Sequence, residues 1–207
     1  MFIKEVGFKN LMKEAWNRGI LFVSRKDDEI LIFGGSWIWC GQIDTIPNKI
    51  KAALVELTGE FPEINQSFKS GKNQDNQYEF TETIPWDRVN ILFNLYYEEH
   101  SSEINETRVL LESMSGEHYR VYRNSENVLM LPAVYSFQLS NAEIMEDREH
   151  AYEGPFVAKF TDIQARLVYW SNSTSMLACF EVIPDDWRKD FMESMKGQVI
   201  EESRHKS

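Results

Sequence analysis

The sequence predicts an α+β fold in which antiparallel hairpins are combined with amphipathic helices. Pairs of β-rich runs are separated by short polar turns, and stripes of apolar residues at helical spacing lie before and after them. Of the 207 residues, 43% are hydrophobic and 13% are aromatic, which is enough for a core without disulfide or metal support. We therefore expect a soluble globular protein and not a disordered or disulfide-stapled chain.

The chain begins with a predicted amphipathic helix and hairpin. Apolar side chains recur at helical spacing over residues 6–18, and Gly19 follows where the helix should end. The runs ILFVSR and ILIFGGSWIW flank the polar turn KDDE and predict two paired strands. Gly34 and Gly35 interrupt the second run, so we expect a bulge or a bend there.

A second helix and a long polar segment follow the hairpin. Thr45 is predicted to cap this helix, which has Pro47 in its first turn and ends at Gly59. Residues 63–77 are polar and nearly free of apolar side chains. A segment of this kind is typical of a disordered loop, and less commonly of a functional one.

The rest of the chain carries similar patterns. The run YEFTETI is typical of a strand, and Pro85 and the residues after it predict a helix. Residues 103–115 carry a helical apolar stripe, and the runs HYRVYR and VLMLPAVYSFQL predict a second hairpin. Two more strands, ARLVYW and SMLACFEVI, precede a helix that begins at Pro184.

Two stretches of the first half of the chain resemble two stretches of the second. VSRKDDEILIF, from Val23, aligns with VYRNSENVLML, from Val121. TETIPWD, from Thr81, aligns with FEVIPDD, from Phe180, at nearly the same spacing. This similarity predicts two tandem copies of a helix-hairpin-strand-helix unit of about 100 residues, packed as a pseudo-dimer.

The repeat defines the expected domain organisation. The two α+β units would span residues 1–99 and 100–200, and residues 201–207 would form a frayed charged tail. The alternative is that hairpins and proline-led helices look alike by chance. Residues 1–200 would then form a single domain.

Net charge excludes some classes of partner. The chain has 22 Lys and Arg residues against 33 Asp and Glu residues, so its formal net charge is −11. Duplex DNA and anionic membranes would be repelled, so we expect neither direct nucleic-acid binding nor membrane binding. The first residues lack the apolar segment of a signal peptide, and no uncharged run reaches the ~18 residues of a membrane helix, which predicts a cytoplasmic protein.

The sequence contains no recognisable catalytic or metal-binding motif. Cys40 and Cys179 lie far apart in apolar runs and are predicted to be buried free thiols. The four histidines form no zinc motif with Cys, Asp or Glu. Glycine-rich nucleotide loops, a serine-hydrolase elbow and a calcium loop are missing from the sequence, so we assign no catalytic residue, cofactor or metal ligand.

Tryptophans and acidic residues are the strongest candidates for a binding surface. Trp37 and Trp39 share one face of a strand, and acidic side chains concentrate in the segment AEIMEDREHAYEG. Aromatic rings with a polar rim are enriched at protein interfaces, although rings of this kind also build cores. The residues predicted to bind a partner are Trp37, Trp39, Trp86, Glu143, Glu146, Asp147, Glu149 and Glu153.

Three functions are compatible with these patterns. The first is a non-enzymatic acidic protein that neutralises a basic protein partner, as a bacterial toxin-immunity protein or inhibitor does. The second is an enzyme with a cleft site between the two halves, for which a hydrolase is the first choice of activity. Its candidate groups are His118, His150, Glu181 and Asp186. The third is a nucleic-acid mimic of a phage or mobile element, which the interspersed basic residues disfavour.

Overall fold

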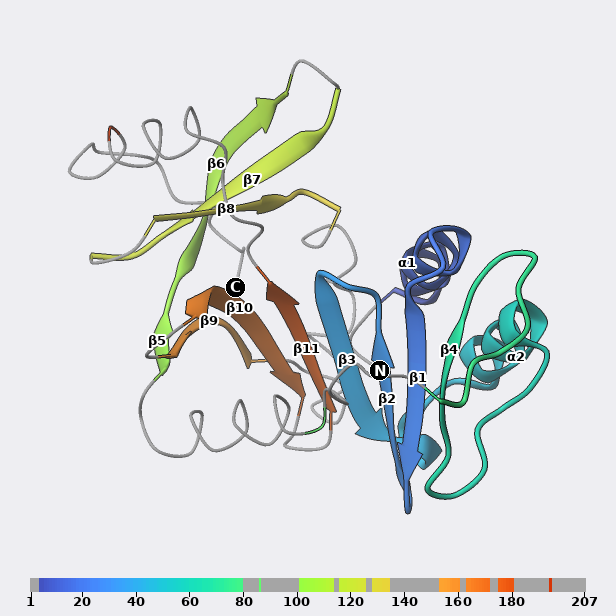
Figure 1. Cartoon of the computed structure of the whole chain (residues 1–207). Coiled ribbons are helices and arrows are strands. Elements are labelled where there is room, and N and C mark those ends of the chain that lie inside the picture. Colours follow the sequence, from blue (N-terminus) through green and yellow to red (C-terminus); the bar gives the residue numbers. More distant parts are fainter. Residues whose placement is uncertain are drawn as a thin grey trace.

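The computed structural model has helices and two antiparallel sheets, which confirms the α+β class (Figure 1). It describes residues 4–79, 86, 101–113, 116–125, 128–134, 153–160, 163–171, 175–180 and 194. Within β5, β9, β10 and β11, side-chain burial is described only for Leu177. One sheet has eight strands and the other has three. None of the described helices is long and apolar enough to cross a membrane.

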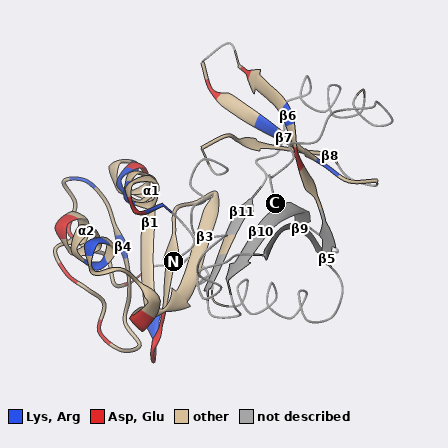
Figure 2. Ribbon diagram, turned by 180° about the vertical axis from the view of Figure 1, so that it is seen from behind, with Lys and Arg blue, Asp and Glu red and all other residues tan. Residues whose placement is uncertain are grey.

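The N-terminal half of the large sheet is a meander covered by two helices. Its elements are α1 (Glu5–Asn17), β1 (Leu21–Lys26), β2 (Glu29–Phe33), β3 (Trp37–Gln42), the 3₁₀ turn η1 (Ile43–Thr45), α2 (Asn48–Thr58) and β4 (Ser67–Ser70). Strand β4 pairs antiparallel with β1 at the outer edge. Most charged residues of this half lie on the helices, in the loops and at the strand ends, whereas β3 carries none (Figure 2).

The other half of the large sheet comes from distant parts of the chain. Its strands are β5 (Ser101–Glu103), β9 (Glu153–Phe160), β10 (Ile163–Ser171) and β11 (Ser175–Phe180). The strand order β4-β1-β2-β3-β11-β10-β9-β5 places a three-strand meander and one outer strand on each side of a seam. At the seam β3 and β11 pair antiparallel, with Trp39 opposite Leu177.

The small sheet is a meander of β6 (Asn105–Glu112), β7 (His118–Arg123) and β8 (Val128–Pro132). Thr107 is fully buried in β6, and its hydroxyl donates to the Val121 carbonyl of β7 at 2.8 Å. At the opposite end of β7, the Ala133 amide donates to the His118 carbonyl at 2.8 Å. These contacts hold the meander together at both ends.

One hydrophobic core cluster includes residues from both sheets and from α1 and α2. On the helix-covered face, cross-strand pairing produces a row of side chains from β4 through β1, β2 and β3 to β11: Phe68, Val23, Ile32, Trp39 and Leu177. Phe8 of α1 packs against Trp37 and Trp39, with ring centroids 5.6 Å apart in both cases. Tyr122 and Leu131 of the small sheet are fully buried in the same cluster.

The opposite face of β1, β2 and β3 is also buried. Ser24, Leu31 and Cys40 lie side by side across these strands and are at most 2% exposed. Ser24 hydrogen-bonds Ser67 across the β1–β4 pair, and the Trp86 indole donates to Ser24 Oγ. Trp86 therefore joins this face of the sheet to a segment 62 residues further along the chain.

Several predicted elements are confirmed. Helices α1 and α2, the hairpins β1–β2 and β7–β8, and the strands β10 and β11 match the predicted runs. Gly19 and Gly59 follow the two helices with φ of 69° and 81°, as their C-terminal positions require. The sequence did not predict β9, because its residues carry no clear alternating pattern.

The bend predicted at Gly34 and Gly35 is confirmed, because the chain turns there between β2 and β3. The single strand predicted over ILIFGGSWIW is wrong, since this run forms two strands. The predicted cap of α2 is also wrong. Thr45 does not cap α2, because it ends the preceding 3₁₀ turn and its hydroxyl donates to the Gln42 carbonyl. Pro47 occupies the N-cap position of α2, one residue before its predicted place.

The predicted helix over residues 103–115 is also wrong, since β5 and β6 occupy this segment. In β6, Thr107, Val109 and Leu111 are more buried than the residues between them, as in a strand with one buried face. Strand pairing determines the structure although the leucines are also spaced as in a helix. The polar segment 63–77 is ordered, because it contains β4 and continues to a bridge between Lys69 and Gln77.

The remaining fold predictions stay predictions. Apart from Trp86 and Ser194, the predicted helices after Pro85 and Pro184 lie outside the described residues. Most of the YEFTETI strand and the tail 201–207 lie outside them too. The alternatives of two units over 1–99 and 100–200, or of one domain over 1–200, are likewise left open.

Candidate functional site

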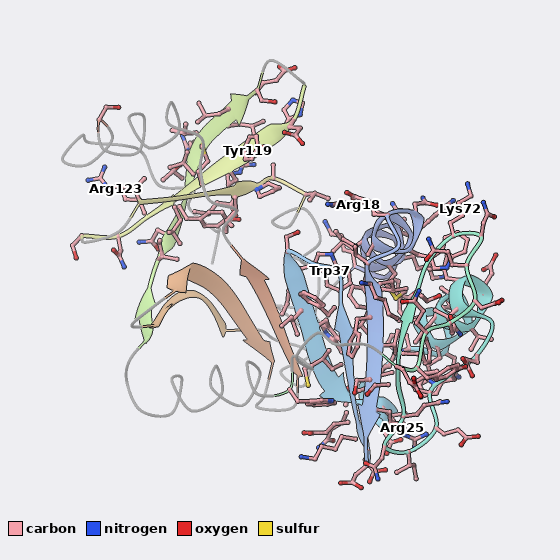
Figure 3. All side chains as sticks on the ribbon, in the orientation of Figure 1. Arg18, Arg25, Trp37, Lys72, Tyr119 and Arg123 are labelled. Atoms are coloured by element: carbon pink, nitrogen blue, oxygen red, sulfur yellow. The ribbon has the colours of Figure 1, made fainter. Side chains whose placement is uncertain are left out.

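A cleft of about 620 Å³ lies between the N-terminal helix and the small sheet. Three parts of the chain line it: α1, the turn between β2 and β3, and the adjacent ends of β7 and β8. Figure 3 shows Arg18, Trp37 and Tyr119 where these parts approach one another. The cleft thus collects side chains that are distant in the sequence.

The floor of the cleft is largely apolar. Leu11 and Ala15 of α1, Trp37 of β3, and Tyr119 and Ala133 of the small sheet line it while being at most 5% exposed. The helical spacing of Leu11 and Ala15 puts both on the core-facing side of α1. A ligand that enters the cleft therefore meets ring and methyl groups at its base.

One wall of the cleft carries an ion pair on α1. Glu14 and Arg18 are one helical turn apart, and Arg18 Nη1 lies 4.0 Å from Glu14 Oε1. Their side chains are 63% and 62% exposed. A pair this long and this exposed contributes little stability, so both groups can exchange partners at low cost.

The opposite wall belongs to the start of β7. The Tyr119 hydroxyl donates to Glu117 Oε2 at 2.7 Å, and the nearly buried tyrosine ring fixes the direction of this bond. His118 Nε2 lies 3.9 Å from Glu112 Oε2, beyond hydrogen-bond range. Glu117 is therefore the oriented carboxylate of this wall.

Trp37 occupies its place in the floor because residue 34 is glycine. A Cβ atom added to Gly34 would lie 2.3–2.5 Å from the indole atoms Cε2, Nε1 and Cζ2 of Trp37. Such distances are far inside van der Waals contact, so any side chain at this position would displace the ring. The glycine pair that was predicted as a bend thus shapes the cleft floor.

The three predicted binding tryptophans lie in different places. Trp37 is 3% exposed and lines the cleft, so a role in partner binding there stays a prediction. Trp39 is fully buried in the core, in agreement with the alternative that this ring is a core residue and not a binding residue. Trp86 is half-buried on the other face of the large sheet, bonded to Ser24.

Most of the other predicted site residues cannot be placed. Glu143, Glu146, Asp147 and Glu149 lie outside the described residues, and Glu153 is described only as the first residue of β9. Of the candidate enzyme groups, His118 lines the cleft, whereas His150, Glu181 and Asp186 lie outside the described part of the chain.

The structure adds cleft residues that the sequence did not single out. Glu14 and Arg18 lie in the predicted first helix, Glu117 directly precedes the predicted strand HYRVYR, and Tyr119 lies within it. No local signal marks them, because the cleft forms only when β7 and β8 approach α1. In the described ranges no group of three or more His, Cys, Asp and Glu residues could hold a metal ion.

A second, more polar groove of about 430 Å³ lies at the C-terminal ends of α1 and α2. Its lining includes Trp16 and the loop residues Asn73, Gln74, Asp75 and Asn76. Asn76 has a structural role, since its side-chain amide donates hydrogen bonds to the Thr58 carbonyl and to the Glu60 carboxylate. Its lining has one carboxylate, Asp75, and two large apolar side chains, Trp16 and Leu57, among mostly polar residues.

No protein-family model matches this chain, and neither a curated protein nor a solved structure shows significant similarity to it.

Proposed function

We propose that the chain is a non-enzymatic binding protein that neutralises a basic protein partner, in the manner of a toxin-immunity protein or inhibitor. The observation that carries this proposal is the cleft between α1 and the small sheet, which combines an apolar floor with carboxylates on both walls. Interfaces of this kind gain affinity from buried rings and methyl groups, and polar groups at the rim set specificity.

The charge of the chain supports the same function. A formal net charge of −11 accelerates encounter with a basic surface, because long-range attraction raises the association rate. The predicted acidic residues from Glu143 to Glu153 would extend this attraction beyond the cleft. Removal of the net attraction by salt should slow association more than it speeds dissociation.

Two finer expectations belong to this proposal. The protein would act in the cytoplasm, where an immunity protein meets a toxin made by the same cell. It would consist of two tandem units packed as a pseudo-dimer, with strands of the two halves paired at the β3–β11 seam. Helix α1 and the small sheet would then contribute to the cleft from different units.

The test is affinity capture with the tagged full chain at low and high salt, followed by reconstitution with the purified captured protein. We expect a stoichiometric basic protein whose binding is weakened by salt and by the charge reversals Glu14→Lys and Glu117→Lys. Glu56→Lys is the matched control, because Glu56 is exposed on α2 and does not line the cleft. Failure to form any stoichiometric complex with a basic protein would refute the proposal.

An enzyme remains the second candidate, favoured by one observation. The cleft lies between parts of the two predicted halves and contains His118 and two glutamates. A histidine and carboxylates in a concave site are a common basis of acid–base catalysis. A thermal-shift screen of small-molecule ligands, repeated on His118→Ala, tests this alternative. Ligands that stabilise the parent chain but not the variant would favour an enzyme.

A further inference from the structure

We propose that the cleft binds an arginine side chain of the basic partner, with the guanidinium held between Glu14 and Glu117. This inference rests on the proposed function and specifies its recognition chemistry. It is derived from three properties of the cleft: the charge of its walls, the orientation of Glu117, and the character of its floor.

The charge of the walls favours a cationic occupant. Among the lining residues Glu14 and Glu117 contribute two carboxylates and Arg18 contributes one cation. Arg18 is a weak competitor for Glu14, because the two exposed groups are 4.0 Å apart. An incoming cation can therefore take over Glu14 without breaking a strong interaction.

Glu117 is oriented before a ligand arrives. Its Oε2 accepts the Tyr119 hydroxyl at 2.7 Å, and the 5% exposed tyrosine holds this carboxylate at the cleft mouth. A carboxylate has about four acceptor positions, so a carboxylate that is already hydrogen-bonded can still accept from a guanidinium. Preorganisation of this kind reduces the entropic cost of binding.

The floor distinguishes arginine from lysine. An ammonium group is compact and strongly hydrated, whereas the planar guanidinium is weakly hydrated and lies readily on aromatic and aliphatic surfaces. Trp37 and Tyr119 contribute ring atoms to the floor, and Leu11 and Ala15 contribute methyl groups. A guanidinium on this floor can direct its N–H groups to both walls, which a single ammonium cannot do as well.

The first test uses three blocked pentapeptides, acetyl-Gly-Gly-X-Gly-Gly-amide with X as arginine, lysine or norleucine. Binding to the ¹⁵N-labelled full chain is followed by NMR. We expect saturable shifts for the amides of residues 14–18 and 117–119 and for the Trp37 indole. The arginine peptide should bind about 2- to 5-fold more tightly than the lysine peptide, and the norleucine peptide more weakly than both.

Charge variants of the cleft should change the affinity for the arginine peptide in opposite directions. Glu14→Gln and Glu117→Gln should each weaken the arginine peptide about 2- to 5-fold, whereas Arg18→Gln should tighten it, because a repelling cation is removed. Glu56→Gln removes the same charge from an exposed helical site and should leave binding unchanged. Equal binding of the arginine and lysine peptides, or equal effects of Glu117→Gln and Glu56→Gln, would overturn the inference.

Failure of this inference can be separated from failure of the proposed function. If a basic partner is captured and the double variant Glu14→Gln/Glu117→Gln holds it as tightly as the parent chain does, the binding function stands and the arginine site is refuted. If the arginine peptide binds as expected and no basic protein forms a complex, the site chemistry stands and the neutralising function is refuted.

Discussion

The indole nitrogen of Trp86 donates a 2.7 Å hydrogen bond to Ser24 Oγ, and Ser24 in turn hydrogen-bonds Ser67 at 2.6 Å. Ser24 is 1% exposed in the middle of β1. This small polar network therefore ties strands β1 and β4 to a residue far along the chain, on the sheet face opposite α1 and α2.

Loss of the Ser24 hydroxyl should destabilise the protein. Ser24→Ala removes the acceptor of Trp86 and the partner of Ser67 in a buried place, which should cost about 1–3 kcal/mol. Urea unfolding measures this change. In a double-mutant cycle with Trp86→Phe, the two substitutions should couple by about 0.5–3 kcal/mol. Strictly additive effects would contradict a direct bond between the two side chains.

A methyl group at residue 34 should disturb the cleft floor. Gly34→Ala would place a Cβ atom within 2.5 Å of the Trp37 indole, so the ring has to move, at a cost of about 1–3 kcal/mol. The matched control is Gly59→Ala, where φ is 81° but no atom lies within 4 Å. The control should lose about 1 kcal/mol from backbone strain alone. Near-ultraviolet circular dichroism should report ring movement for Gly34→Ala and not for Gly59→Ala.

Cys40 should be inert in the folded protein. Burial raises the pKa of the Cys40 thiol above its ordinary value, and the negative charge of Glu29 raises it further. Because the thiolate is the reactive form, a Cys179→Ser variant should react with a disulfide reagent only after unfolding in urea. Rapid reaction of this variant without denaturant would show that Cys40 is accessible.

Tyr78 should make stability depend on alkaline pH. Its hydroxyl donates to the Glu60 carboxylate, which raises the pKa of Tyr78 above the ordinary value of 10.0. Above that value the folded state binds more protons than the unfolded state, so rising pH lowers the free energy of unfolding. The contribution is complete below pH 10 and is lost as the pH climbs through the raised pKa.

Tyr78→Phe isolates this effect from the other tyrosines. The parent chain should be more stable than the variant at pH 8, and the difference should shrink at pH 11. Urea unfolding at the two pH values provides the comparison. A difference that stays constant between pH 8 and pH 11 would mean that the bond between Tyr78 and Glu60 does not affect titration.

The elements that were predictable from sequence are those with local signals. The apolar stripe of α1 with Gly19 at its end, and the polar turn after Lys26, are complete within a few residues. The helix expected over residues 103–115 failed because its leucines lie in a strand whose register is set by β7. Pairing between distant segments makes these residues a strand and not a helix, and a short stretch of sequence carries no information about that pairing.

The cleft could not have been predicted for a related reason. Leu11 and Trp37 were recognised as apolar residues of their elements, but nothing in the sequence placed Glu117 opposite Glu14. The polar loop that includes Gln77 is ordered because Lys69 bridges to it and Asn76 bonds the end of α2. These contacts depend on the tertiary fold and not on composition.

The seam between β3 and β11 has a consequence for biosynthesis. When the ribosome has produced Trp37–Gln42, the strand that will pair with its outer edge is still more than 130 residues from being made. At about 5–20 residues per second, this edge stays open for about 7–27 s. It is rich in apolar residues, with tryptophans at 37 and 39, and an unpaired apolar edge pairs readily with other chains. A chain further along in synthesis on a neighbouring ribosome could insert its β11 at this open edge, so chaperone supply during translation should determine how much of the protein becomes monomeric.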